Sequence, residues 1–137
     1  MKYKILIFIL MFSLLITACG TADATPSATP DLCSAENLPA EVAKVNKLMR
    51  EFDDYSSLAS NTPQAQLVEL IPEMQRILRD AEDLQTPSCL QTLKQLQMSH
   101  MNLVIQILMA FMNNSDVAAI NAGIAQSREL HSQYDIE

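Results

Sequence analysis

Two histidines and a set of methionines are the side chains in this sequence best suited to bind a metal. The chain has only two histidines, His100 and His131, and eight methionines. If its helices run antiparallel with short turns, as argued below, one layer of the bundle contains Met49, Met74, Met98, His100, Met101 and His131. Thioether sulfurs and imidazole nitrogens at one height suit Cu(I), or a haem ligated from opposite helices.

The same methionines have a simpler interpretation as core residues. Methionine is a common filler of helical cores. Met98 and His100 are two residues apart, so they cannot both point inward from one helix. We therefore predict no cofactor, and we keep binding of Cu(I) or haem as the alternative.

Residue patterns typical of enzymes are missing from the sequence. It contains no Glu-x-x-His pair of the kind that holds di-iron centres in bundles, no glycine-rich phosphate loop and no His-Glu-x-x-His motif. Ser99 and His100 are neighbours, and neighbouring residues on a helix do not face each other. The acidic runs at residues 53–54 and 80–83 are typical of solvated helix faces. We therefore predict that the protein is not an enzyme.

Four amphipathic segments must position these side chains. Apolar residues recur at three- and four-residue steps over about residues 38–60, 63–85, 87–113 and 116–134, which indicates four helices. Asn37, Thr62-Pro63 and Thr86-Pro87 are start signals, and asparagine at 113–114 suits the left-handed backbone that ends a helix. Long helices joined by short turns predict an all-α, antiparallel up-down-up-down four-helix bundle over residues 31–137.

The third segment carries apolar residues beyond its predicted core-facing stripe. From residue 103 to residue 112 only Gln106 is polar, and a helix that is apolar all round is buried or covered. Three residues lie off the stripe and form a candidate surface for a homodimer or a protein partner at the tip of the bundle: Ile105, Met109 and Met112. The alternative is that this helix is simply the most buried of the four.

Residues 1–20 have the pattern of an export signal. Lys2 and Lys4 precede an apolar run that is too short to span a bilayer and that ends in Ile16-Thr17-Ala18-Cys19. This ending resembles the lipobox of bacterial lipoproteins. The resemblance implies a signal peptide of residues 1–18, cleavage before Cys19, and acyl chains such as palmitate on Cys19. Residues 19–30 would then be the lipidated cysteine and a flexible linker, because they are small, polar and proline-bearing.

The charge balance limits the partners of the chain. Its formal net charge is −7, and removal of residues 1–18 would take away Lys2 and Lys4 to leave −9. Phosphate backbones and anionic headgroups repel such an acidic protein. We therefore predict no nucleic-acid binding and attachment to the membrane through lipid alone. We expect a protein on the extracytoplasmic face of the cell membrane that acts as a non-enzymatic interaction or structural module.

Two cysteines remain once Cys19 is assigned to the lipid. Outside the cytoplasm, two thiols tend to form a disulfide. Cys33 precedes the first helix and Cys89 lies in the first turn of the third, and these two helix starts share one end of an up-down-up-down bundle. We therefore predict a disulfide between Cys33 and Cys89.

Overall fold

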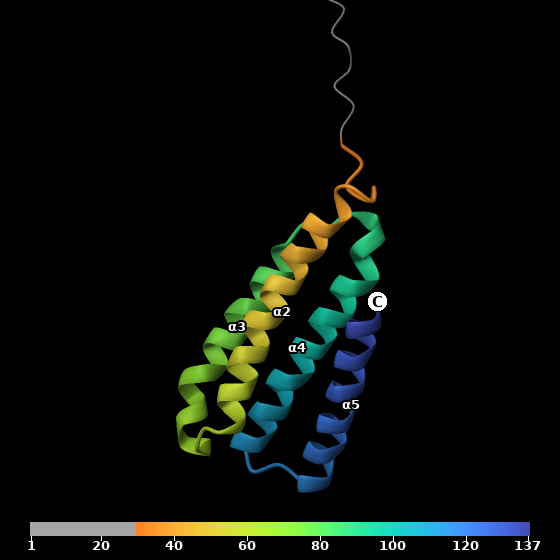
Figure 1. The fold of residues 1–137 in the computed structure, drawn as a ribbon. Helices are drawn as coiled ribbons and strands as arrows, with labels where there is room; N and C mark the ends of the chain where they lie inside the picture. The colour runs from red at the N-terminus through yellow and green to blue at the C-terminus, as the bar shows by residue number, and fades with distance from the viewer. Residues whose placement is uncertain (1–29) are drawn as a thin grey trace, which may run out of the picture. The chain divides into compact units, whose positions relative to one another are not determined.

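The computed structural model describes residues 30–137, and within them the chain forms four long helices (Figure 1). They are α2 (Leu38–Ser60), α3 (Leu67–Asp83), α4 (Gln91–Met112) and α5 (Val117–Ile136). The prediction of an all-helical chain with four helices is confirmed. The predicted signal peptide, the lipidated Cys19 and the linker up to residue 29 lie outside the described residues. Among the helices of residues 30–137, none is both long and apolar enough to cross a bilayer.

The helix ends differ slightly from the sequence expectation. The second and third segments each open with a short 3₁₀ turn, η1 (Gln64–Gln66) and η2 (Ser88–Leu90), and prolines directly precede both turns. Asn114 adopts a left-handed backbone with φ of 51° between α4 and α5, as expected for asparagine at a helix end. Asn37 is the N-cap residue of α2, as predicted, but its side chain makes no capping hydrogen bond, and its amide donates instead to the Asp31 carbonyl and to Ser34 Oγ.

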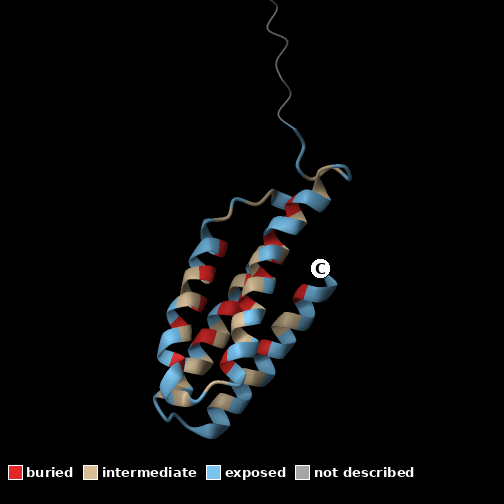
Figure 2. Ribbon diagram, turned by 60° about the vertical axis from the view of Figure 1, so that its left-hand side comes forward, coloured by how far each residue is buried: buried red, intermediate tan, exposed pale blue. Residues whose placement is uncertain are grey.

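Three helices build most of the core. Helices adjacent in the chain pack against each other, and α2 also contacts α4. In Figure 2 the buried residues lie along the inward faces of these helices. The buried apolar set includes Val45, Met49, Phe52, Leu67, Ile71, Met74, Ile77, Leu93, Met101 and Ile105. Burying each large side chain of this kind contributes about 1.5–3 kcal/mol to folding.

Helix α5 is attached differently from the other three. It packs mainly on α4 and contacts α2 little, and its only buried residues are Ser127 and Tyr134. Gly123 lies close to α4, since a Cβ at this position would come within 2.9 Å of Ile107 Cγ1. The seam between α2 and α5 is therefore less closely packed than the rest of the bundle.

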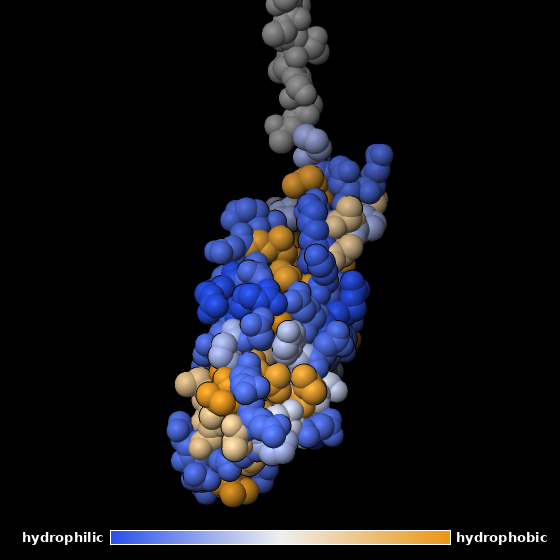
Figure 3. All heavy atoms as spheres, turned by 90° about the vertical axis from the view of Figure 1, so that its left-hand side faces the viewer, coloured by the Kyte–Doolittle hydropathy of each residue, from blue (hydrophilic) through white to orange (hydrophobic). Residues whose placement is uncertain are grey.

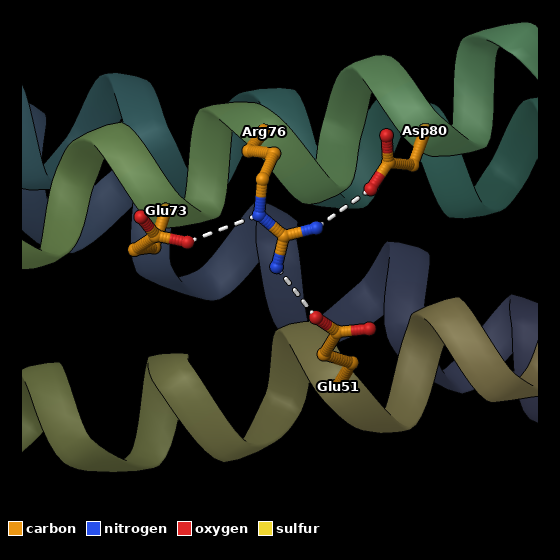
Figure 4. A network of polar contacts seen from close by, with 4 residues as sticks. All are labelled: Glu51, Glu73, Arg76 and Asp80. Carbon is orange, nitrogen blue, oxygen red and sulfur yellow. Dashed lines mark hydrogen bonds and ion pairs between the residues drawn. The ribbon is translucent and has the colours of Figure 1, made fainter.

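Polar contacts connect the helices inside and outside the core. The fully buried amide of Gln97 on α4 donates from Nε2 to the Val45 carbonyl of α2 at 2.8 Å. On the surface, Arg76 of α3 pairs with Glu73, Asp80 and, across to α2, Glu51 (Figure 4). Because exposed ion pairs are screened by water, this network orients α2 and α3 more than it stabilises them.

A disulfide closes one end of the domain. Cys33, in the turn before α2, is bonded to Cys89 in η2, and their Cα atoms are 5.9 Å apart. The predicted pairing is confirmed. The bond fixes the start of α2 beside the start of α4.

Candidate functional site

A groove lies between α2 and α5, with α4 as its floor. It has a volume of about 710 Å³, within the range of about 300–1,000 Å³ that is typical of small-molecule sites. Its apolar walls are formed mainly by aliphatic side chains of α3, α4 and α5, together with one phenylalanine: Leu67, Val104, Leu108, Phe111, Ile120 and Ile124. It exists because α5 rests on α4 without closing onto α2.

A second hollow of about 500 Å³ continues the seam towards the end of the domain that carries the disulfide. It is more polar, with Asn46, Arg50 and Asp135 among its lining residues. Asp53 of α2 and His131 of α5 line both hollows. These two side chains therefore lie at the boundary between the two hollows.

Three titratable side chains from three helices meet at this boundary. Asp53, His100 and His131 each offer one ligand atom, and these atoms all lie within 4.8 Å of one another. The two imidazole rings are 4.9 Å apart between centroids in an edge-on arrangement. His131 Nδ1 is 3.9 Å from Asp53 Oδ1. The fold thus brings the only two histidines of the chain together beside a carboxylate.

His100 is fixed in position by its neighbours. Only 6% of its surface is exposed, and the edge of its ring lies near Phe52, with 6.2 Å between ring centroids. Its Nδ1 lies 2.9 Å from the Ser127 carbonyl oxygen, which can only accept, so Nδ1 carries the proton and donates. Burial lowers the pKa of His100, and the nearby His131 adds to this effect. The neutral ring therefore keeps a lone pair on Nε2.

His131 and Asp53 are less enclosed than His100. Their side chains are 34% and 39% exposed, so both can change rotamer. Desolvation raises the pKa of Asp53, while the His131 imidazole opposes that rise. His131 Nε2 is also 3.7 Å from the exposed Asp135 carboxylate, one helical turn further along α5. The cluster contains two imidazoles and two carboxylates, a set that can bind a cation or exchange protons.

The structure separates the predicted Met/His layer into two groups. Three of its methionines are core residues that are 0–3% exposed: Met49, Met74 and Met101. Met98 is partly buried against the same core. His100 and His131 instead face each other at the α2–α5 seam. Cu(I) or haem binding by the whole layer stays a prediction.

The predicted partner surface needs one correction. Ile105 is only 4% exposed, because the buried row of α4 runs at four-residue steps through Leu93, Gln97, Met101 and Ile105. In the second half of α4, Val104, Leu108 and Phe111 line the groove instead. On a helix that is apolar nearly all round, periodicity alone does not identify the core-facing side.

The two methionines of that surface lie in a shallow apolar depression between α3 and α4. Met109 is 45% exposed, and it lines the depression with Met112, Val68, Ile71 and Pro72. Figure 3 shows apolar side chains gathered near the N-terminal end of α3, where this depression lies, below a hydrophilic band. A homodimer or protein partner at this end of the domain stays a prediction.

Sequence reasoning missed three participants in the histidine site. Asp53 was assigned to a solvated acidic run, and Ser127 and Asp135 were not considered. The spacing of His131 and Asp135, four residues apart on one helix face, was a usable signal. No such signal indicated that Asp53 lies near the histidines, because its position depends on how far α2 is rotated about its own axis. The Ser127 contact uses a backbone carbonyl, which no residue type reveals.

Comparisons of the chain with models of protein families, with curated proteins and with solved structures find no match. Function must therefore be inferred from the site itself.

Proposed function

We propose that this protein is a lipid-anchored, extracytoplasmic binding protein, not an enzyme. In this proposal its up-down-up-down four-helix bundle holds a small amphipathic molecule in the groove between α2 and α5. The observation that carries the proposal is the open seam. A bundle whose fourth helix closed onto α2 would bury Ile120 and Ile124, whereas here both line a groove of about 710 Å³.

The groove favours a small molecule with an aliphatic body and a polar head. Its walls are mainly aliphatic, so they suit hydrocarbon more than a stacked aromatic ring. The His131 and Asp53 side chains lie at one end of the groove, where it borders the second hollow, with 3.9 Å between Nδ1 and Oδ1. His100, His131 and Arg128 at the same end offer hydrogen-bonding groups to a polar head.

The proposed anchor is supported by the lipobox-like sequence ending at Cys19 and by the Cys33–Cys89 disulfide. Disulfides persist in oxidising compartments outside the cytoplasm. An acidic chain does not adhere to anionic headgroups by charge, so a covalent lipid would provide the attachment. Two acyl chains are sufficient for stable anchoring, whereas one binds only marginally.

The groove can be tested with a pair of variants on one helix. Ile124→Glu places a charge in the apolar wall, whereas Val117→Glu places it on a residue of α5 that is 68% exposed and does not line the groove. We expect native mass spectrometry of the full-length chain, purified from membranes in detergent, to show a bound small molecule in wild type and Val117→Glu. Ile124→Glu should retain at least tenfold less.

Circular dichroism melting curves would verify that both variants remain folded. A wild-type protein without any bound molecule, or equal retention by the two variants, would contradict the proposal.

A further inference from the structure

We propose that Asp53, His100 and His131 form a binding site for one divalent transition-metal ion of borderline softness, with Zn(II) as the preferred ion. Each ligand comes from a different helix: Asp53 from α2, His100 from α4 and His131 from α5. These three side chains also line the groove, but metal binding needs no small molecule there, so the two proposals can be tested separately.

The distances are compatible with metal binding after small side-chain movements. Zn–N and Zn–O bonds of about 2.0–2.1 Å in a tetrahedral site put ligand atoms about 3.3 Å apart. The three ligand atoms lie within 4.8 Å of one another, so each distance between two ligand atoms must shorten by about 1.5 Å at most. His100 is held rigidly by its burial and its bond to Ser127. The two half-exposed side chains, Asp53 and His131, can make the adjustment.

His100 has the outer hydrogen-bond acceptor that metal-binding histidines usually have, and His131 has a carboxylate close enough to become one after a small movement. A ligating imidazole generally donates its other N–H to a carbonyl or carboxylate, which fixes the tautomer and makes the ligand more basic. His100 donates from Nδ1 to the Ser127 carbonyl, so Nε2 is left to bind the metal. His131 has Asp53 near Nδ1 and the Asp135 carboxylate 3.7 Å from Nε2.

The ligand types select the metal. Two imidazoles and one carboxylate suit Zn(II) and similar divalent ions, whereas Cu(I) prefers thiolates and thioethers. Three protein ligands leave at least one coordination position for water or another donor. The Asp135 carboxylate, 3.7 Å from His131 Nε2, adds negative charge that favours a cation.

The test is titration of the full-length protein, without a polyhistidine tag and in detergent, with Zn(II) in a calorimeter and with Co(II) as an absorbing probe. We expect one equivalent of Zn(II), and a higher thermal midpoint in its presence. His131→Gln should weaken binding at least 100-fold, and Asp53→Asn by 10- to 100-fold. Asp135→Asn, which removes only an outer acceptor, should weaken binding about tenfold.

Asp54→Asn is the matched control, because it removes the neighbouring exposed carboxylate of the same helix and should leave the affinity unchanged. The side chains of Asp53 and Asp135 are 39% and 62% exposed, so their asparagine variants test the site even if a histidine variant unfolds. Absence of Zn(II) binding, or equal affinity in Asp53→Asn, Asp54→Asn and wild type, would overturn the proposal. Binding of Cu(I) without Zn(II) would also overturn it and would favour the methionine layer.

Discussion

Tyr134 shows how a single residue connects α5 to α2. Its ring is 7% exposed, and its phenol donates a hydrogen bond to Asn46 Oδ1. Burial raises the pKa of Tyr134 to about 12, and the neighbouring Asp53 and Asp135 charges act in the same direction. Between pH 10.0, the ordinary pKa of a tyrosine, and about pH 12, the phenol therefore stays protonated in the folded protein.

The consequence for stability has a definite sign. The folded state keeps the proton on Tyr134 at a pH where the unfolded chain has already lost it. The protonated phenol therefore contributes its full stabilisation of the fold below pH 10, and this stabilisation is lost as pH rises towards about 12. We expect ultraviolet absorption titration to show a tyrosinate step near pH 12 that is absent in Tyr134→Phe. Identical titration curves for the two proteins would contradict this.

The residue scale is also where prediction from sequence had its limits. The height of His100 and His131 in the bundle could be estimated, because it depends only on turn positions and helix rise. Which side chains face each other at that height could not be, since it depends on helix rotation and tilt. Gln97 illustrates the same limit, because a polar residue occupies a position on α4 that is fully buried. Its Oε1 accepts no hydrogen bond from the described protein atoms.

At the scale of elements, the contact between α4 and α5 depends on Gly123. An alanine there would gain about 1 kcal/mol in helix propensity but would bring its Cβ within 2.9 Å of Ile107 Cγ1. Overpacking of this kind costs about 1–3 kcal/mol. We therefore expect Gly123→Ala to lower the free energy of unfolding by about 1 kcal/mol, measured by urea denaturation.

Ile107→Ala provides the matched background, because it removes both atoms that would clash. In that background Gly123→Ala should instead raise the free energy of unfolding by about 1 kcal/mol, the propensity gain alone. Equal effects of Gly123→Ala in the two backgrounds would show that the close approach at Ile107 is energetically unimportant.

The helices themselves were predictable because their signals are local. The apolar period, the prolines near the starts and the asparagine turn before α5 all act within a few residues. The role of each helix was harder to predict. α4 contacts the three other helices and therefore has no polar face in its second half, whereas α5 packs mainly on α4 and buries only Ser127 and Tyr134. That asymmetry opens the groove, and it arises from packing between distant segments.

At the scale of the whole molecule, the disulfide is the strongest single constraint. It links residues that are 56 apart in the sequence, and closing a loop of this length stabilises a fold by about 4 kcal/mol in the chain-entropy model. We expect Cys33→Ser with Cys89→Ser to lower the free energy of unfolding by about that amount, measured by urea denaturation. Full reduction of the wild type should have the same effect, and an unchanged urea midpoint in both cases would contradict it.

The position of this bond also determines how the domain would respond to mechanical load. A pulling force applied near residue 31 and at the C-terminus would pass from Cys33 directly into Cys89, so α2 and α3 would carry none of it. Only α4, α5 and the surface between them would resist the pull. Because the bonded cysteines are 56 positions apart, the intact disulfide would also shorten the fully stretched chain by about 190 Å compared with the reduced protein.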